Sequence, residues 1–199
     1  MGHLFYVCGK SSTGKDTIYR KLMEDASLNL KAVVPYTTRP IRAGEEEGRE
    51  YHFTDIEELE RLTKAGLVIE RRCYHTMHGD WHYYTVDDGN INLAENNYLI
   101  IGTLESYIKT RDYFGEDRVL PIYIELDDGE RLQRALTRER LEVNPKYAEM
   151  CRRFLADMED FAAERIEEAG IVKRFVNNDL NVCYNEVCDY ICSVNADVT

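Results

Sequence analysis

The sequence lacks the features that mark secreted or membrane proteins. It has no charged leader followed by an apolar segment and no apolar run long enough to cross a bilayer, so neither secretion nor a membrane span is expected. None of its six cysteines forms a Cys-x-x-Cys pair. Reduced cysteines packed as small apolar groups are therefore expected in place of a disulfide framework, which indicates a cytoplasmic protein.

Positive charge is also scarce. The chain has 25 lysines and arginines against 37 aspartates and glutamates, a formal net charge of −12. This balance argues against non-specific nucleic-acid binding and against attachment to an anionic membrane surface. If the ligand is a phosphate, its positive partners must be gathered locally on an acidic background.

What remains is the composition of an ordinary globular protein. The 199 residues are 44% hydrophobic and 31% charged, enough for one domain with a substantial core. No repeat, linker or low-complexity tract interrupts the chain. Its oligomeric state cannot be read from the sequence.

Short apolar runs alternate with helical patterns toward both ends of the chain, which predicts a parallel sheet covered by helices. The middle third is typical of antiparallel strands with one helix, which predicts an inserted mixed α/β lobe over 35–88. Asp55 and Glu58 resemble a capping box at the start of that helix, and Gly66 is a natural stop. The predicted strands are 4–8, 33–34, 67–70, 81–86, 98–101, 119–126 and 172–176. The predicted helices are 15–25, 55–66, 104–114, 128–140, 147–168 and 181–193.

A glycine-rich segment follows the first predicted strand. Residues 9–17 read GKSSTGKDT, with the G-x-x-x-x-G-K spacing of a phosphate-binding loop. Glycines let backbone N–H groups turn toward phosphate oxygens, and the following helix presents its N-terminus to the negative charge. A plain turn with a solvated lysine is the alternative, but the order strand, loop, helix favours a nucleotide site in which Lys15 reaches the terminal phosphates. The predicted ATP ligands in this segment are Gly9, Ser11, Ser12, Thr13, Gly14, Lys15, Asp16 and Thr17.

Asp16 stands where a hydroxyl residue that supports Mg²⁺ is usual. A carboxylate opposes a phosphate contact, yet it suits the first turn of a helix if it points away from the phosphates. Thr17, one place later, supplies a hydroxyl, as in some nucleoside monophosphate kinases. We therefore predict that Thr17 supports Mg²⁺ bound through the ATP phosphates.

A second motif occupies residues 36–53, YTTRPIRAGEEEGREYHF. Arg39 and Arg42, followed by Tyr51, can surround one phosphate, because guanidinium forks match oxyanion geometry. Alone, the segment would be a solvated polar loop. Together with the phosphate loop it resembles the guanylate kinase signature T-T-R-x-P-R-x-G-E-x-x-G-x-x-Y-x-F, with the proline one place early. The resemblance extends over essentially the whole chain, to VNNDL at 176–180 and a final helix.

The resemblance implies a P-loop NTPase-type parallel sheet with flanking helices, an inserted lobe and a helical lid. It implies a single domain with a core at 1–34, 89–133 and 154–199, a GMP-binding lobe at 35–88 and a lid at 134–153. The implied reaction is ATP + GMP → ADP + GDP, with Mg²⁺ bridging the ATP phosphates.

The acceptor site is also implied by the resemblance. Glu70 matches a glutamate that accepts two adjacent guanine N–H donors, a pair that adenine does not offer, and Thr85 matches a hydroxyl near the guanine oxygen. On its own, Glu70 would be interpreted as a surface salt-bridge residue. The implied ligands of GMP are Arg39, Arg42, Tyr51, Glu70, Tyr83 and Thr85.

The arginine-rich stretch 131–154 matches the family's lid. Arg134, Arg138 and, after a gap, Arg153 match arginines that close over the ATP phosphates, and Asn177 matches a residue that touches the adenine. The alternative for the arginines is an ordinary exposed helix with interleaved charges. The predicted catalytic residues are Lys15, Arg39, Arg138 and Arg153.

Three departures leave the acceptor open. Pro35 replaces a serine, Tyr84 replaces a glycine, and Ile101-Gly102-Thr103 stands where the family tends to have Asp-x-Asp; Glu105 lies near enough to be a replacement carboxylate. The Gly-Thr pair and the GKD tripeptide resemble ribose 1,5-bisphosphate phosphokinase, a sugar-phosphate kinase without the full arginine–tyrosine signature. A non-catalytic, phosphopeptide-binding module is a further alternative, although such modules typically have degraded phosphate loops.

Cys73, His75, His78 and His82 raise the question of a metal site. Their spacings do not match the usual zinc patterns. A hairpin with polar residues at its tip is the better interpretation, and no dedicated metal site is predicted.

Overall fold

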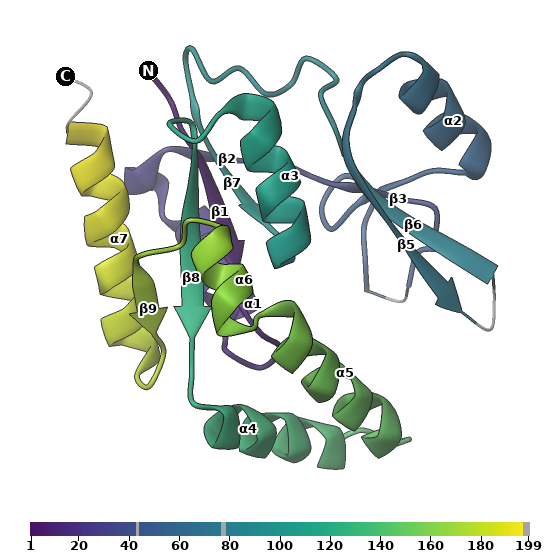
Figure 1. Cartoon of the computed structure of the whole chain (residues 1–199), viewed down its shortest axis with the longest axis vertical. Coiled ribbons are helices and arrows are strands. Elements are labelled where there is room, and N and C mark those ends of the chain that lie inside the picture. The colour runs from purple at the N-terminus through teal and green to yellow at the C-terminus, as the bar shows by residue number, and fades with distance from the viewer. Residues whose placement is uncertain (43, 77–78, 197–199) are drawn as a thin grey trace.

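A five-stranded parallel sheet forms the centre of the molecule (Figure 1). The computed structural model describes residues 1–42, 44–76 and 79–196. The strand order is β2-β7-β1-β8-β9, and every neighbouring pair is parallel. The strands are β1 Leu4–Cys8, β2 Leu30–Ala32, β7 Asn97–Ile101, β8 Val119–Glu125 and β9 Arg174–Val176.

Helices cover both faces of this sheet. All five residues of β1 are buried, as expected for a strand with a helical layer on each side. On one face, Phe5 and Val7 pack with residues of α1 (Lys15–Glu24) and α7 (Leu180–Ala196). On the other face, Tyr6 packs with residues of α3 (Leu104–Phe114) and α6 (Ala163–Glu168). A short 3₁₀ helix, Ala26–Leu28, leads into β2. The predicted fold class is therefore confirmed at the level of the core.

The second sheet lies to one side of the core with its own helix (Figure 1). Its strand order is β4-β3-β6-β5. The helix α2, Ile56–Lys64, begins at Asp55, whose side chain accepts a hydrogen bond from the Glu58 backbone, as predicted. The Glu58 side chain binds Arg61, so the capping box is only half formed. The strands are β3 Tyr36–Thr37, β4 His52–Phe53, β5 Val68–Thr76 and β6 Gly79–Val86.

A bulge in β5 decides which way the acceptor lobe's side chains point. Val68 lies opposite Val86, but Glu70 lies opposite Thr85, so Ile69 is an extra residue in β5. A bulge reverses the alternation of faces. Glu70 therefore shares a face with Thr85, while Val68 and Val86 pack toward Leu59 and Leu62 of α2.

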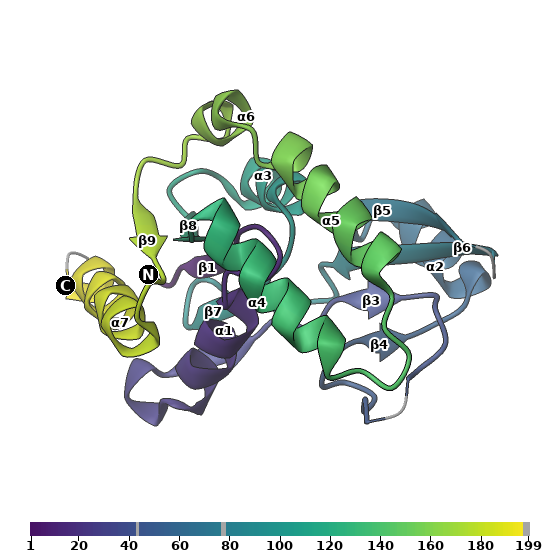
Figure 2. The same ribbon diagram turned by 90° about the horizontal axis from the view of Figure 1, so that it is seen from below.

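Two helices project from the end of the core sheet and form the arginine-rich region. Figures 1 and 2 show α4 (Asp128–Arg140) leaving the end of β8, with α5 (Tyr147–Asp160) beside it. In Figure 2 both run toward the side where the second sheet lies. The core, lobe and lid boundaries given above stay a proposal.

Three secondary-structure predictions were wrong in part. The strand expected at 33–34 is β2, three residues earlier, and Val33 is the buried residue that follows it. The helix expected at 147–168 breaks after Asp160, because Phe161 turns into the core and packs against Tyr123. The strand expected from 172 begins at Arg174, since Val172 is 92% exposed. Among the described residues, no helix is long and apolar enough to cross a membrane.

Candidate active site

The glycine-rich loop lies at the carboxyl end of β1 and runs into α1. Gly9 and Gly14 have φ values of 148° and 90°, and Ser12 also has a positive φ of 65°. A Cβ on Gly14 would meet the Asn177 Nδ2 at 2.3 Å, and one on Gly9 would meet the Ile124 carbonyl oxygen at 2.3 Å. Both glycines are therefore required by conformation and by space.

Asn177 is buried against this loop. Its Nδ2 donates to the Thr13 carbonyl oxygen at 2.7 Å, and Arg134 Nη2 donates to the Asn177 carbonyl oxygen at 3.1 Å. The Asn177 Oδ1 atom is buried with no donor among the described residues. Asn177 thus shapes the phosphate loop directly, and its predicted contact with adenine stays a prediction.

Lys15 lies in a cavity of about 570 Å³ between the loop and the helices α4 and α5, which are called the lid helices below. Its Nζ is 3.6 Å from the Asp16 carboxylate, and the Asp16 side chain is 83% exposed. Asp16 lines the same cavity as Lys15, so it does not simply point away from the expected phosphate position, whereas Thr17 is outside that lining. The lining also includes the predicted residues Ser11, Ser12, Arg138 and Arg153.

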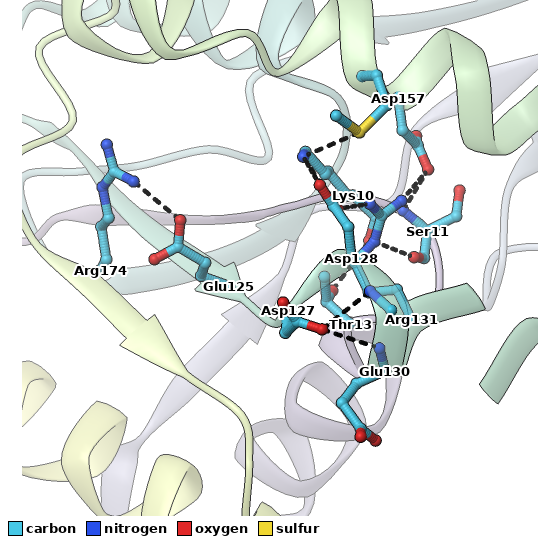
Figure 3. Close-up of polar contacts among 12 residues, drawn as sticks. Lys10, Ser11, Thr13, Glu125, Asp127, Asp128, Glu130, Arg131, Asp157 and Arg174 are labelled. Atoms are coloured by element: carbon cyan, nitrogen blue, oxygen red, sulfur yellow. Dashed lines mark hydrogen bonds and ion pairs between the residues drawn. The ribbon is translucent and has the colours of Figure 1, made fainter. Parts of the chain in front are cut away.

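A buried ionic cluster fastens the lid helices to the loop (Figure 3). Arg131, which is 1% exposed, donates from Nε to the Ser11 carbonyl oxygen at 2.9 Å and from Nη2 to Asp157 at 2.8 Å. Its Nη1 donates to Asp128, which also accepts from Lys10 at 3.1 Å. Asp157 accepts in addition from the Ser11 backbone N–H at 2.8 Å. One aspartate from each lid helix therefore holds the loop through a shared arginine.

Four residues of this cluster were not predicted from the sequence: Lys10, Asp128, Arg131 and Asp157. Arg131 stands in a run of interleaved arginines and glutamates, and Asp157 follows it 26 residues later. Neither position carries a local signal, because their relation exists only once α4 and α5 lie side by side.

The three predicted lid arginines occupy different places. Arg134 and Arg138 reach the loop, Arg138 donating from Nη2 to the Ser12 hydroxyl at 3.3 Å. Arg153 lines the cavity but donates from Nε to Glu149 at 3.0 Å. Hydrogen bonds from Arg152, and then from Arg153, hold the pKa of Glu149 at about 2. Glu149 is therefore an anion that Arg153 would have to leave to bind a phosphate.

Arg39 is the buried cation of the second sheet. Its Nη1 and Nη2 bind the Glu45 carboxylate at 2.7 and 2.6 Å, and its guanidinium lies 5.1 Å from the centre of the Tyr51 ring. The Arg39 Nε is buried with no acceptor among the described residues. Tyr51 also packs edge-on against Tyr83, with ring centres 5.5 Å apart. The structure thus brings Arg39, Tyr51 and Tyr83 together, and the Arg39 Nε is a donor without an acceptor in the part of the chain that the structure describes.

Arg42 lies at the edge of this group. Its backbone N–H donates to Glu45 at 2.9 Å, and its guanidinium lies 5.9 Å from the Trp81 ring. Glu45 was not singled out in the sequence, although it is the glutamate of the Gly-Glu pair in the signature. Glu45 accepts from the Arg39 side chain and from the Arg42 backbone, the two predicted phosphate-binding arginines.

The Glu45 ion pair gives a pH prediction. Its hydrogen bonds to Arg39 lower the pKa of Glu45 from 4.5 to about 2. A carboxyl with a depressed pKa in the folded state stabilises the protein above the unfolded-state pKa, and this contribution is lost as pH falls through the folded-state value. Glu45→Gln should therefore lower the unfolding free energy by roughly 1–2 kcal/mol at pH 7.

Urea denaturation from pH 7 downward would measure that difference, which should shrink between pH 4.5 and about pH 2. The exposed neighbour Glu46 is the control, and Glu46→Gln should change little. A Glu45→Gln deficit that is the same at every pH would contradict a charge-based contribution.

Glu70 is buried at the boundary between the second sheet and the core. Its carboxylate accepts from the Thr85 hydroxyl at 2.9 Å and from the Arg72 Nε at 3.0 Å. Arg72 Nη1 in turn lies 3.4 Å from the Thr103 hydroxyl. Burial alone would lower the pKa of Arg72, but the charge of Glu70 and the hydroxyls of Tyr6 and Tyr74 raise it overall. Glu70 and Thr85 are together as predicted, whereas Arg72 was not foreseen.

Within the segment 101–103, Gly102 is a glycine for a steric reason. A Cβ on Gly102 would meet the Tyr6 hydroxyl at 2.1 Å, so this position has no room for a side chain. Thr103 and Ser106 form a reciprocal capping box at the start of α3, and the Tyr6 hydroxyl donates to the Ser106 hydroxyl at 2.6 Å. Glu105 pairs with Lys109 on an exposed face of α3, so it does not replace the missing carboxylates.

The two other departures are structural. Tyr84 is fully buried, stacks on Tyr36 with ring centres 5.4 Å apart and shares a hydrogen bond with the Thr54 hydroxyl at 2.6 Å. The Pro35 carbonyl oxygen accepts from the His52 N–H at 2.9 Å, beside the pairing of β3 with β4.

The cysteine–histidine hairpin has an ordinary explanation. Potential ligand atoms of Cys73, His75 and Asp80 lie within 4.8 Å of one another on the exposed end of β5 and β6. His75 and Asp80 are already hydrogen-bonded at 2.7 Å, which accounts for their approach. His82 instead faces Arg71, and His78 lies outside the described residues.

The parallel sheet, the glycine loop at the end of its central strand and the arginines of α4 and α5 beside that loop define the class of P-loop kinases. The family model described as guanylate kinase matches residues 2–88. A guanylate kinase of Porphyromonas gingivalis is 30% identical over 190 residues, covering 94% of this chain and 95% of that relative. A guanylate kinase of Thermotoga maritima is 27% identical over 190 residues, covering 96% of this chain and 78% of that relative. This chain belongs to the guanylate kinase family.

A solved structure supports the fold. The crystal structure of guanylate kinase from Anaplasma phagocytophilum matches with a TM-score of 0.64 and 22% identity. The match covers 96% of this chain and 85% of the other. The core sheet, second sheet and projecting helices are therefore one known arrangement.

Proposed function

We propose that this protein is a guanylate kinase that transfers the γ-phosphoryl group of ATP to GMP, giving ADP and GDP. The observation that carries the proposal is the pairing of an intact phosphate loop with a buried acceptor pair on the second sheet. Lys15, Arg138 and Arg153 share one cavity, while Arg39 and Glu70 are buried in the lobe of the second sheet. Family membership supports the same reaction.

The donor side would neutralise the charge of the moving phosphoryl group. Phosphoryl transfer depends on position and charge and needs no covalent enzyme intermediate. Lys15, Arg138 and Arg153 are proposed to hold the transferring phosphoryl group, with loop N–H groups around the other phosphates. Arg153 would have to leave Glu149 for this, which ties its use to closure of the lid over ATP and exclusion of water.

The acceptor side would hold GMP at two points. The proposed phosphate ligands include Arg39, whose buried Nε is an unused donor, with Arg42, Tyr51 and Tyr83 around it. The proposed base ligands are Glu70 and Thr85. The Thr85 hydroxyl donates to Glu70 at 2.9 Å and so helps to hold the carboxylate in place.

Nucleotide kinases generally use a divalent metal, and the loop offers oxygen donors that fit Mg²⁺. The Thr17 hydroxyl and the cavity-lining Asp16 carboxylate are both hard oxygen ligands of the kind that Mg²⁺ prefers. Mg²⁺ bound with ATP would supply charge neutralisation between its phosphates. We propose that Thr17 supports Mg²⁺ and that Asp16 does so as well, because the Asp16 side chain lines the cavity.

One assay tests the reaction and its alternatives together. ADP release should be measured with Mg²⁺–ATP and GMP, dGMP, AMP, UMP or ribose 1,5-bisphosphate in turn. Turnover is expected with GMP, and little turnover is expected with AMP or UMP. Turnover with ribose 1,5-bisphosphate but none with GMP would establish the sugar-phosphate alternative instead.

A thermal shift separates an enzyme from a peptide-binding module. A ligand that binds only the native state raises the melting temperature. Mg²⁺–ATP should raise it here, because the phosphate loop is complete; no shift would favour a non-catalytic module.

We also propose a cytoplasmic protein without nucleic-acid or membrane partners, on the grounds of its charge balance.

Glu70→Ala should separate acceptor from donor binding. Loss of the carboxylate should lower kcat/KM for GMP by about tenfold to a hundredfold, since hydrogen bonds to a charged group contribute about 1.5–3 kcal/mol. KM for ATP should change by less than about twofold, because Glu70 lies outside the ATP cavity. Initial-rate kinetics in each substrate give both values.

The exposed Glu60 of α2 serves as the control, and Glu60→Ala should leave both constants unchanged. Equal losses for GMP and ATP in Glu70→Ala would remove Glu70 from base recognition.

A further inference from the structure

The Glu70 carboxylate is already largely occupied. A carboxylate offers about four lone-pair positions for hydrogen bonds. Oε1 accepts from the Thr85 hydroxyl at 2.9 Å and from the Arg72 Nη2 at 3.3 Å, and Oε2 accepts from the Arg72 Nε at 3.0 Å. These three contacts leave about one position, on Oε2. Guanine would present two adjacent donors, N1–H and the 2-amino group.

Arg72 cannot easily release the carboxylate. Arg72 and Glu70 are two residues apart in β5 and therefore lie on one face, and the two side chains are 14% and 0% exposed. Separating them would leave two charges uncompensated in a buried place, which is strongly unfavourable. Nη1 of Arg72 also faces the Thr103 hydroxyl at 3.4 Å, at the start of α3 in the core.

We propose that Arg72 determines the acceptor specificity of this enzyme by occupying the carboxylate that reads the purine. The position left on Glu70 suits N1–H, which GMP and IMP share, and the 2-amino group of GMP finds no acceptor there. The protein therefore phosphorylates GMP and IMP with kcat/KM values within about tenfold of each other. AMP, which has no N1–H, is rejected. This proposal rests on the proposed phosphotransfer to GMP.

The test compares wild type with Arg72→Met, which removes the guanidinium and keeps much of the side chain's volume. In the variant both Glu70 oxygens become available, so the 2-amino group of GMP can donate to a carboxylate. The ratio of kcat/KM for GMP over IMP should rise by about tenfold or more, because a hydrogen bond to a charged group is worth that factor. KM for ATP should stay within about twofold of wild type.

Arg71 provides a matched control in the next position of β5. Its side chain lies on the opposite face of the strand, with Nε 3.3 Å from the His82 Nδ1. Arg71→Met should leave the GMP-to-IMP ratio unchanged. Adding Glu70→Gln to Arg72→Met should cancel the gain, since an amide has only one acceptor oxygen.

Three results would overturn the proposal. A lower ratio in Arg72→Met would mean that Arg72 supports the reading of the 2-amino group. Equal losses for GMP and IMP would mean that Arg72 only holds β5 against the core. A wild-type ratio above about a hundredfold would mean that the 2-amino group is already read.

If Arg72→Met does not fold, Arg72→Lys gives the same test, because one ammonium group cannot cover both oxygens, and an intermediate rise is expected. A wild-type protein that phosphorylates neither GMP nor IMP would contradict the proposed function itself. A protein active on GMP with an unchanged ratio in Arg72→Met would contradict only the role of Arg72.

Discussion

Lys15→Ala should reduce kcat for phosphoryl transfer to GMP by at least about a hundredfold. Lys15 lies in the cavity formed by the glycine loop and the lid helices, and its ammonium group lies 3.6 Å from the exposed Asp16 carboxylate. A preorganised charge that faces the transferring phosphoryl group contributes more in the transition state than in the ground state. Single-turnover and steady-state ADP release would both show the loss.

The matched control is Lys31→Ala, which changes an exposed lysine of β2 and should leave kcat unaltered. The variant's melting temperature should stay close to that of wild type, because the ion pair of Lys15 is with Asp16, which is 83% exposed. Near-normal turnover in Lys15→Ala would mean that the loop is not the donor phosphate site.

Arg131→Ala should produce the largest loss of stability, about 3 kcal/mol in the unfolding free energy. Arg131 is the shared partner of Asp128, Asp157 and the Ser11 carbonyl oxygen, and its guanidinium lies 4.9 Å from the Phe154 ring. Removing it leaves two carboxylates facing each other in a partly buried place and frees the loop from the lid helices. Urea denaturation measures the loss directly.

Arg140→Ala, at the exposed end of the same helix, should lower stability by less than about 0.5 kcal/mol. The Arg131 variant should also raise KM for ATP, because the loop it holds is the one that surrounds the phosphates. A variant as stable as wild type would show that the cluster in Figure 3 contributes little net free energy.

Local patterns were enough to predict most of the core. The helices at 104–114 and 128–140 begin and end where predicted. Their capping residues Thr103 and Asp127, and the stop at Gly115, lie directly beside each helix in the sequence. The break at Phe161 was not predictable in this way. The position of this break depends on which side chain packs into the assembled core, here that of Phe161 against Tyr123.

In the candidate site too, contiguous motifs were predictable and contacts made by the fold were not. The glycine loop and the arginine–tyrosine motif are contiguous in the sequence, so their residues could be named in advance. The partners that hold them could not: Arg131 and Asp157 meet only through helix packing, and the contacts of Arg72 with Glu70 and Thr103 depend on how the second sheet lies against the core. The assigned roles of these residues remain predictions.

The dependence of the glycine loop on Asn177 has a consequence for synthesis of the chain. Asn177 comes 163 positions after Gly14, directly beyond the edge strand β9, yet its amide fills the space beside that glycine and bonds the Thr13 carbonyl oxygen. The loop is made before Asn177, and the contact that shapes it becomes possible only after 163 further residues have been added. A nascent chain therefore carries the complete phosphate-loop motif long before it has the loop's final shape.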